Sequence, residues 1–420
     1  MKIKIGVFGL GYVGLPLAIE FGKIYDVVGY DIDYNRINSL KKNIDYNKDI
    51  PIYKFLQARK LKFTSNIKSL ENCNTYIITV PTPITSSKKP DLKFIINASK
   101  SIGKLLKKKD TVIIESTVYP GLTEEICLPV LEKISKLKFN RDFYLGYSPE
   151  RVNPNDKKYT IENIIKITSG SNKKTSLFVD NLYKKIIKAG TYRAESIKVA
   201  EAAKVIENSQ RDINIAFMNE LCLIFDKLGI NTDEVLKAAS TKWNFVNFKP
   251  GIVGGHCIGV DPYYLTHKSK KMGYNPKIIT SGRKINDEFI NFILKKSIKY
   301  SRKKFSSKNL KFLVLGLTFK ENCVDYRNSQ SIRLVKKLKE KNITTHCFDP
   351  LINIDDFNKN NKLKINKLIK KNYYHCCIIS VAHKYFKKLG QRKIENYLLN
   401  NGFIFDVKNI LPKHKNNIYL

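Results

Sequence analysis

Short apolar runs alternate with longer stretches of helical periodicity over the first part of the chain. Residues 3–8 and 26–30 are predicted to be buried strands, with a helix at about 13–21 between them. Further apolar runs at 75–80 and 111–115 each lead into a turn that contains Pro or Gly. This alternation predicts a doubly wound sheet, in which ligands gather at the carboxyl ends of the strands.

A long helix is predicted next. The stretch from Glu195 to about Leu228 is rich in Ala and contains neither Pro nor Gly, and Gly229 stands where a helix would end. A second helix is expected to begin near Asn231, which is a suitable N-cap residue. The length of the first helix suggests a spine between domains, and an exposed face on it would suit dimerisation.

The last part of the chain loosely repeats the first. A strand at 310–316, a helix near 331–341 and a strand ending at Asp349 are predicted, without the glycine spacing of the N-terminal unit, and the polar stretch 301–309 is the clearest linker. We therefore expect an α/β fold with two Rossmann-like doubly wound domains joined by a long central helix. The expected domain boundaries are 1–190, 191–300 and 301–420.

The chain is strongly basic, with a formal net charge of +39. A clustered excess of Lys and Arg would indicate nucleic acid or an anionic membrane as partner. Here the lysines are spread through every segment and accompany no recognised nucleic-acid-binding module, so neither partner is expected. A basic field would still attract an anionic nucleotide substrate.

The cysteines are scattered, with no CxxC pair and no spacing typical of zinc ligands, which indicates a reducing compartment and no metal site. They lie at 73, 127, 222, 257, 323, 347, 376 and 377. No apolar run reaches the roughly 20 residues that a bilayer-spanning helix needs. We expect a soluble, cytoplasmic protein.

A dinucleotide-binding fingerprint follows the first predicted strand. Its residues are Gly9, Leu10, Gly11, Tyr12, Val13 and Gly14. A turn of this spacing lets the backbone approach a pyrophosphate at the N-terminus of the next helix. Asp31 ends the second strand, where a carboxylate binds ribose hydroxyls and disfavours the extra phosphate of NADP, although Arg36 keeps that choice open. NAD is the expected cofactor.

One cysteine lies in a glycine-rich segment, Gly254-Gly255-His256-Cys257-Ile258-Gly259-Val260-Asp261-Pro262. A buried structural thiol is the common alternative, but such a segment suits close approach to a ligand. A thiol can hold a carbonyl carbon while a nicotinamide takes a hydride from it, provided a cation activates the sulfur. Lys204 is the candidate cation, and Asn208 lies one turn further along the same helix face, where both could stabilise an oxyanion. Spacing alone favours the alternative, a solvated Lys and Asn on a helix surface.

Together these motifs resemble the UDP-glucose/GDP-mannose dehydrogenase family over nearly the whole chain. Besides the fingerprint and the cysteine segment, the matching motifs are Pro81-Thr82-Pro83, Glu115-Ser116-Thr117-Val118-Tyr119-Pro120-Gly121, Ser148-Pro149-Glu150-Arg151, Glu201 with Lys204 and Asn208, Phe319-Lys320-Glu321, and Asp325-Tyr326-Arg327-Asn328-Ser329. The resemblance implies that NAD-dependent oxidation of a sugar C6 alcohol proceeds through an aldehyde to a carboxylate.

The resemblance also implies a role for each matching residue. Cys257 would form a thiohemiacetal and then a thioester, Lys204 and Asn208 would stabilise oxyanions together with Asp261, and Lys204 would also move the alcohol proton. Glu150 would be the general base for thioester hydrolysis, with Thr117 near the hydrolytic water.

Binding residues follow from the same matches. Thr82, Thr117 and Arg327 would contact NAD, and Arg151, Phe319 and Lys320 the nucleotide sugar. Residues Phe245 to Gly251 would line the sugar site, and Lys242 would reach it across a homodimer interface. Lys408 stands where some relatives carry arginine, which puts bidentate phosphate binding in doubt.

The stretch from His256 to Leu265, with Asn153-Pro154, is most similar to the branch that oxidises UDP-N-acetylhexosamines, UDP-GlcNAc or UDP-GalNAc, for capsular or O-antigen polysaccharide. UDP-glucose and GDP-mannose remain alternative substrates for the same chemistry. A two-electron hydroxyacid dehydrogenase and a catalytically silent nucleotide- or nucleic-acid-binding relative are the alternatives from other classes.

Overall fold

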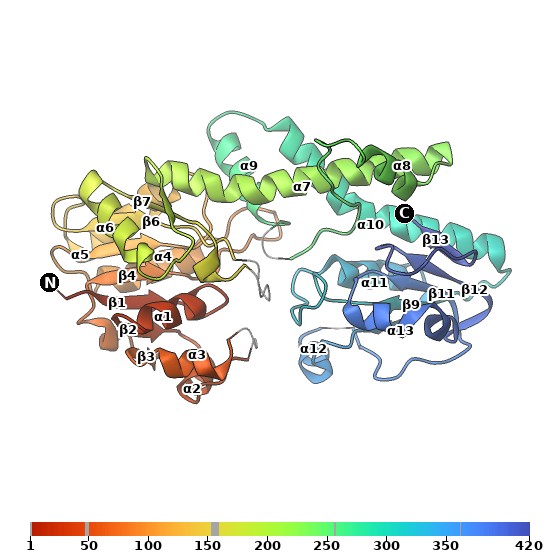
Figure 1. Ribbon diagram of the computed structural model, residues 1–420, viewed down its shortest axis with the longest axis horizontal. Coiled ribbons are helices and arrows are strands. Elements are labelled where there is room, and N and C mark those ends of the chain that lie inside the picture. Colours follow the sequence, from red (N-terminus) through yellow and green to blue (C-terminus); the bar gives the residue numbers. More distant parts are fainter. Residues whose placement is uncertain (1, 47–49, 153–158, 256–257, 362) are drawn as a thin grey trace. The chain divides into compact units, whose positions relative to one another are not determined.

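A computed structural model describes residues 2–46, 50–152, 159–255, 258–361 and 363–420 (Figure 1). The chain divides into two compact units, the first comprising Met1–Glu207 with Tyr263–Asn275 and the second Asn208–Pro262 with Pro276–Leu420. Each unit has its own sheet, and the predicted α/β fold with two doubly wound domains is confirmed. Helix α7 (Ile197–Leu228) begins in the first unit and ends in the second.

The first unit contains, among its described residues, an 8-stranded sheet of order β3-β2-β1-β4-β5-β6-β7-β8. Its strands are β1 (Lys4–Phe8), β2 (Asp26–Tyr30), β3 (Leu61–Thr64), β4 (Thr75–Ile78), β5 (Thr111–Ile114), β6 (Tyr144–Tyr147), β7 (Lys166–Gly170) and β8 (Thr191–Arg193). Strand β7 runs antiparallel to β6, whereas the other neighbours are parallel. The strand order changes direction between β1 and β4, which is the switch point where doubly wound sheets bind ligands.

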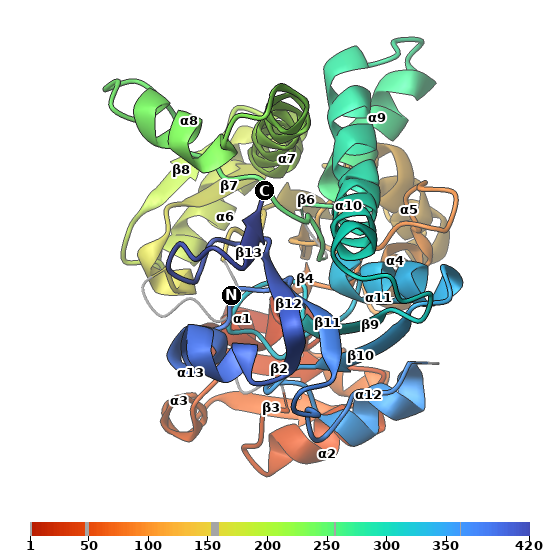
Figure 2. The same ribbon diagram turned by 90° about the vertical axis from the view of Figure 1, so that its right-hand side faces the viewer.

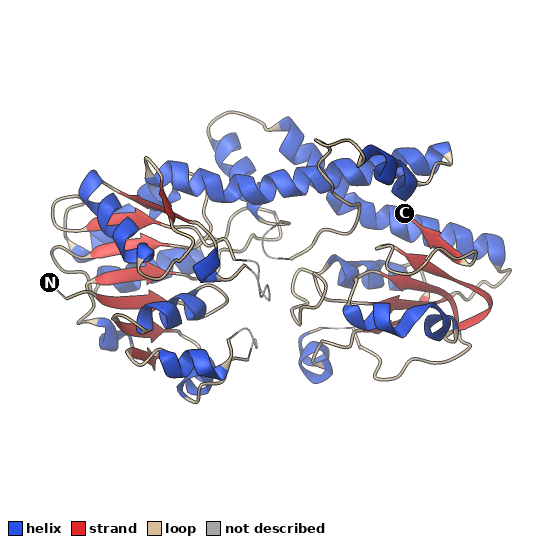
Figure 3. Cartoon of the chain, viewed as in Figure 1, coloured by secondary structure: helices blue, strands red, loops and turns tan. Residues whose placement is uncertain are grey.

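Helices cover both faces of this sheet (Figure 3). They are α1 (Gly14–Gly22), α2 (Tyr34–Lys41), α3 (Ile52–Gln57), α4 (Lys93–Gly103), α5 (Leu128–Ser135) and α6 (Lys173–Lys184), and α9 (Asp261–Lys271) lies mostly in this unit. Because side chains alternate along a strand, Ile5 and Val7 face the core that contains residues of α1 and α6, while Gly6 faces Tyr76 on the other side.

The second unit has a parallel sheet of order β10-β9-β11-β12-β13. Its strands are β9 (Lys311–Leu315), β10 (Thr344–Phe348), β11 (Tyr374–Ile379), β12 (Leu398–Asp406) and β13 (Asn417–Tyr419), and its helices are α8 (Thr232–Ala239), α10 (Lys277–Lys304), α11 (Gln330–Glu340), α12 (Ile354–Asn360) and α13 (Lys384–Glu395). Phe312 and Val314 pack with residues of α10 and α11, whereas Leu313 and Leu315 pack with residues of α13 on the opposite face (Figure 2).

The predicted linker at 301–309 is partly wrong, because α10 continues to Lys304. Ser297 and Ser301 are fully buried one turn apart, so these small residues belong to the packed face of a helix and not to a loop. The three domain boundaries expected from the sequence stay a prediction. No helix in the described ranges combines the length and the apolar character that crossing a membrane requires.

In the second unit α7 packs against α10 through buried polar groups. Asp212 lies 2.5 Å from the Arg283 guanidinium and 2.8 Å from the Asn286 side-chain nitrogen, and all three residues are almost fully buried. Burial raises the pKa of Asp212, and Arg283 opposes that rise. A charged group that is buried away from water destabilises the fold unless an opposite charge pairs with it.

Replacing Arg283 with methionine is expected to lower the free energy of unfolding by about 3–5 kcal/mol, because Asp212 would keep a buried charge without its cation. Arg211→Met, at an exposed position of the same helix, is the matched control and should cost less than about 1 kcal/mol. Urea unfolding followed by circular dichroism measures both. Equal stability of the two variants would contradict the expected role of the ion pair.

Candidate active site

The turn between β1 and α1 is tightly packed at Gly14 and uncovered at Gly11. A Cβ at Gly14 would lie 1.8 Å from the Gly9 carbonyl oxygen and 2.3 Å from Thr79 Oγ1, and that hydroxyl donates a 2.7 Å hydrogen bond to the same carbonyl. A Cβ at Gly11 would meet no atom within 4 Å. The backbone is thus accessible at Gly11 and fits the pyrophosphate of a dinucleotide at the N-terminus of α1.

Asp31 is held at the carboxyl end of β2. Its carboxylate accepts the Leu10 amide at 2.8 Å and the Asp33 amide at 2.9 Å, which fixes it beside the glycine turn. This position suits the ribose contact predicted from the sequence.

Arg36 points into the protein. It is buried, donates to the Leu10 carbonyl from two nitrogens at 3.1 and 3.0 Å, and pairs with Asp45 at 2.7 Å. These contacts support the turn, while a direct contact of Arg36 with the cofactor stays a prediction. Asp45 belongs to no sequence motif, so its pairing with Arg36 was not predictable.

Glu201 connects α7 to the loop that contains Thr117. Its fully buried carboxylate accepts the amides of Gly121 at 2.5 Å and Thr123 at 2.9 Å. Burial raises the pKa of Glu201 to about 7, and hydrogen bonds from the loop oppose that rise. Lys204, almost one turn later on α7, is also buried. Glu201 therefore fixes this loop to the helix of the predicted catalytic lysine.

Glu150 follows β6 and is fixed by its own backbone. Its Oε1 accepts the amides of Arg151 at 2.7 Å and Val152 at 2.5 Å, and its Oε2 lies 3.6 Å from the Nζ of Lys166. Arg151 instead pairs with Glu207 at 2.8 Å. Lys166 was not found by sequence reasoning, because it lies in a strand outside the motifs.

In the second unit the structure brings Asn208 and Asp261 together. The Asn208 amide nitrogen donates to Asp261 Oδ2 at 2.6 Å, and Asp261 is buried at the start of α9. This contact fixes the orientation of the Asn208 side-chain amide, which is predicted to stabilise an oxyanion. Cys257 and His256 lie outside the described residues.

Glycines permit close packing around the second unit's loops. A Cβ at Gly255 would lie 2.5 Å from the Phe319 ring, and the Gly255 amide donates to the Asn328 carbonyl at 3.3 Å. The segment before Cys257 therefore packs on the loop that contains Phe319. Lys320 lies beside that ring, with its Nζ 5.8 Å from the ring centre.

Lys408 lies close to Gly251, at which a Cβ would be 2.5 Å from the lysine Nζ. Burial lowers the pKa of Lys408, and the charge of Glu321 opposes this effect. Asn219 on α7 holds Gly251 by accepting its amide at 2.7 Å and donating to its carbonyl at 3.1 Å. A lysine in this position offers a point charge for phosphate instead of a bidentate contact.

The remaining predicted binding residues are exposed or half-buried. Arg327 is exposed and bound to Asp325 at 2.7 Å, and Lys242 is exposed in the segment after α8. Tyr12, Val13, Thr82, Thr117 and Phe245 are half-buried.

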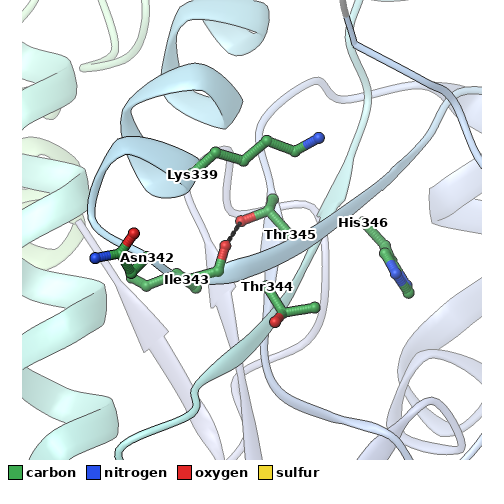
Figure 4. Close-up of a pocket in the computed structure, with 6 residues that line it drawn as sticks. All are labelled: Lys339, Asn342, Ile343, Thr344, Thr345 and His346. Atoms are coloured by element: carbon green, nitrogen blue, oxygen red, sulfur yellow. Dashed lines mark hydrogen bonds between the residues drawn. The ribbon is translucent and has the colours of Figure 1, made fainter.

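A hollow of about 460 Å³ lies elsewhere in the second unit (Figure 4). Its lining comes from the end of α11, the following turn and the start of β10, and consists of Lys339, Asn342, Ile343, Thr344, Thr345 and His346. Ligands of doubly wound sheets bind at the carboxyl ends of strands, whereas this hollow is at an amino end. It is therefore not the candidate site.

Comparisons with known proteins agree with the motifs. Residues 3–187, 198–288 and 313–413 match the NAD-binding, central and UDP-binding domains of the UDP-glucose/GDP-mannose dehydrogenase family. The UDP-N-acetyl-D-glucosamine 6-dehydrogenases of Salmonella typhi and Pseudomonas aeruginosa are each 49% identical to this chain, with alignments covering 100% of it and 99% of each relative.

A solved structure is also similar. The UDP-D-ManNAc dehydrogenase of Pyrococcus horikoshii superposes with a TM-score of 0.89 at 30% identity, covering 99% of this chain and 98% of that one. The chain thus belongs to the UDP-glucose/GDP-mannose dehydrogenase family and is an NAD-dependent UDP-sugar dehydrogenase.

Proposed function

We propose that this protein oxidises the C6 hydroxyl of a UDP-N-acetylhexosamine, UDP-GlcNAc or UDP-GalNAc, to a carboxylate. The observation that carries the proposal is the 49% identity, over nearly full length, to two UDP-N-acetyl-D-glucosamine 6-dehydrogenases. Each sugar would consume two NAD⁺ and one water and release two NADH and three protons. The uronate product would serve polysaccharide assembly.

The glycine turn at Gly9–Gly14 would hold the cofactor's pyrophosphate and Asp31 its ribose. When bound, NAD supplies the hydride acceptor for both oxidations. The second unit would hold the UDP-sugar through Phe319, Lys320 and the half-buried Lys408. These assignments are supported by the open backbone at Gly11 and by the packing of Gly251 and Gly255.

Cys257 would keep the half-oxidised sugar bound by adding its sulfur to the aldehyde carbon. Lys204 and Asn208 would donate hydrogen bonds to the oxygen of the resulting adduct, with Asp261 orienting the Asn208 amide. Once that carbon reaches the thioester level, Glu150 would take a proton from the attacking water. The C–S bond then breaks, and the sulfur leaves as the thiolate that begins the next cycle.

The protein would act as a homodimer formed through α7. Phe217, Ile224 and Leu228 are 52%, 46% and 63% exposed, and their spacing places them on one face of the helix. A second copy of this chain would cover that apolar face, as the sequence predicts. Lys242 would then reach the partner's sugar site.

The cytoplasm is the proposed location. The described cysteines are buried thiols, which suits a reducing compartment.

The substrate is tested by incubating the protein with NAD and, separately, UDP-GlcNAc, UDP-GalNAc, UDP-glucose and GDP-mannose. We expect two NADH per UDP-N-acetylhexosamine consumed, and a kcat/KM at least tenfold higher than for the other two sugars. Cys257→Ser is the matched variant and should form no uronate, because it lacks the thiol. A preference for UDP-glucose, or a yield of one NADH, would overturn the proposal.

Ile224→Glu should place a charge on the exposed face of α7 and convert the dimer to a monomer. Light scattering after gel filtration should give twice the chain mass of 48.4 kDa for the natural protein and about that mass for the variant. Lys227→Glu, on the same helix but outside the apolar set, controls for the added charge. Equal masses for the natural protein and Ile224→Glu would remove α7 from the interface.

A further inference from the structure

A buried cluster of charges lies beside Glu150 in the first unit. The Nζ of Lys166 is 2.9 Å from Glu115 and 3.6 Å from Glu150, and the lysine side chain is 4% exposed. Tyr183, on α6, donates a hydrogen bond from its hydroxyl to Glu115. One ammonium group therefore lies within 4 Å of two carboxylates, in a site with little access to solvent.

The direction of β7 explains how the lysine reaches this position. Glu115 and Glu150 follow the carboxyl ends of β5 and β6, which are parallel. Strand β7 runs antiparallel to β6, so its first residue, Lys166, lies at the same edge of the sheet. In a parallel strand the first residue would lie at the opposite edge.

The cluster combines two carboxyl groups with one ammonium group, and burial acts on Glu115, Lys166 and Tyr183. Burial raises the pKa of Glu115 to about 7, and Lys166 opposes that rise. Burial disfavours the charged form of Lys166, but Glu115 and Glu150 outweigh this effect and raise its pKa. Burial also raises the pKa of Tyr183 well above its usual value, which keeps the hydroxyl protonated and able to donate.

The guanidinium of the neighbouring Arg151 binds groups other than the Glu150 side chain. The Arg151 guanidinium pairs with Glu207 of α7 at 2.8 Å and donates to the Ile165 carbonyl at 2.8 Å. Glu150 Oε1 is occupied by two backbone amides, while Oε2 accepts no hydrogen bond from the described residues. Oε2 is thus a buried carboxylate oxygen that faces the Lys166 ammonium group.

We propose that Lys166 is a positioning residue for the hydrolytic step: its ammonium group, 3.6 Å from Glu150 Oε2, attracts the Glu150 carboxylate and supplies the positive charge beside it. This inference rests on the proposed function, in which Glu150 is the base for thioester hydrolysis. Glu115 acts in the opposite sense, because it draws on the same ammonium and repels the Glu150 charge. Tyr183 holds Glu115 in place.

The test compares two substitutions that should shift the pH profile of kcat in opposite directions. Lys166→Met removes the cation beside the carboxylate, so the acidic limb should move up by about one pH unit. Glu115→Gln removes the competing carboxylate, so the limb should move down. Lys166→Arg keeps the charge and should restore the natural profile.

A second measurement reports on the intermediate. Below the natural midpoint, Lys166→Met should accumulate a covalent adduct on Cys257, which intact-mass spectrometry after acid quenching detects. If Lys166→Met does not fold, the double variant Glu115→Gln/Lys166→Met removes both members of the buried pair and should still show the upward shift.

The possible outcomes separate this inference from the proposed function. If the natural protein yields two NADH per sugar but all variants keep its acidic limb, Lys166 is only structural and the inference is wrong. A uniform loss of kcat at every pH leads to the same conclusion. If the natural protein yields no NADH from any of the four nucleotide sugars, the proposed function fails and the inference fails with it.

Discussion

Buried polar side chains on α7 are the constraint on which both units depend. Glu201, Asn208, Asp212 and Asn219 recur on the helix at intervals of three to four residues or their multiples, so they share a side. Polar groups lose their water when a helix packs, and each must find a partner in the protein. The partners here are the amides of Gly121 and Thr123, Asp261, the α10 side chains and the backbone of Gly251. A single helix thereby fixes loops that are distant in sequence.

Glycine supplies the complementary constraint within those loops. Gly251 and Gly255 lie where a Cβ would collide with Lys408 and with the Phe319 ring. The loops can therefore approach other groups closely at these points, while the Asn219 side chain of α7 holds Gly251 in place. The same reasoning applies to the glycine turn proposed for the cofactor, where Gly14 permits the contact with Gly9 and the backbone at Gly11 is uncovered. Site geometry thus depends on backbone placement as much as on the reacting side chains.

The sequence predicted those parts of the fold that local periodicity determines. β2 matches the predicted strand at 26–30, and α7 matches the long stretch free of Gly and Pro, because these features follow from side-chain spacing alone.

The direction of β7 was not predictable, since hydrophobic periodicity is the same in both strand directions, and the approach of Lys166 to Glu150 depends on that direction. The inward orientation of Arg36 depends on Asp45, a partner that no motif marks. The motifs did identify Asn208 and Asp261, which the structure joins directly.

We infer that α7 positions the reacting groups by fixing loops through its buried polar groups. Glu201 tests it most directly, because its carboxylate accepts two amides of the loop with Thr117. Glu201→Gln should lower kcat by about 10- to 100-fold, since the new amide group cannot accept both hydrogens and the loop shifts. Glu132→Gln is the matched control, because Glu132 accepts an amide of a loop that holds no site residue. A kcat for Glu201→Gln within twofold of the natural value, with the control unchanged, would contradict the account.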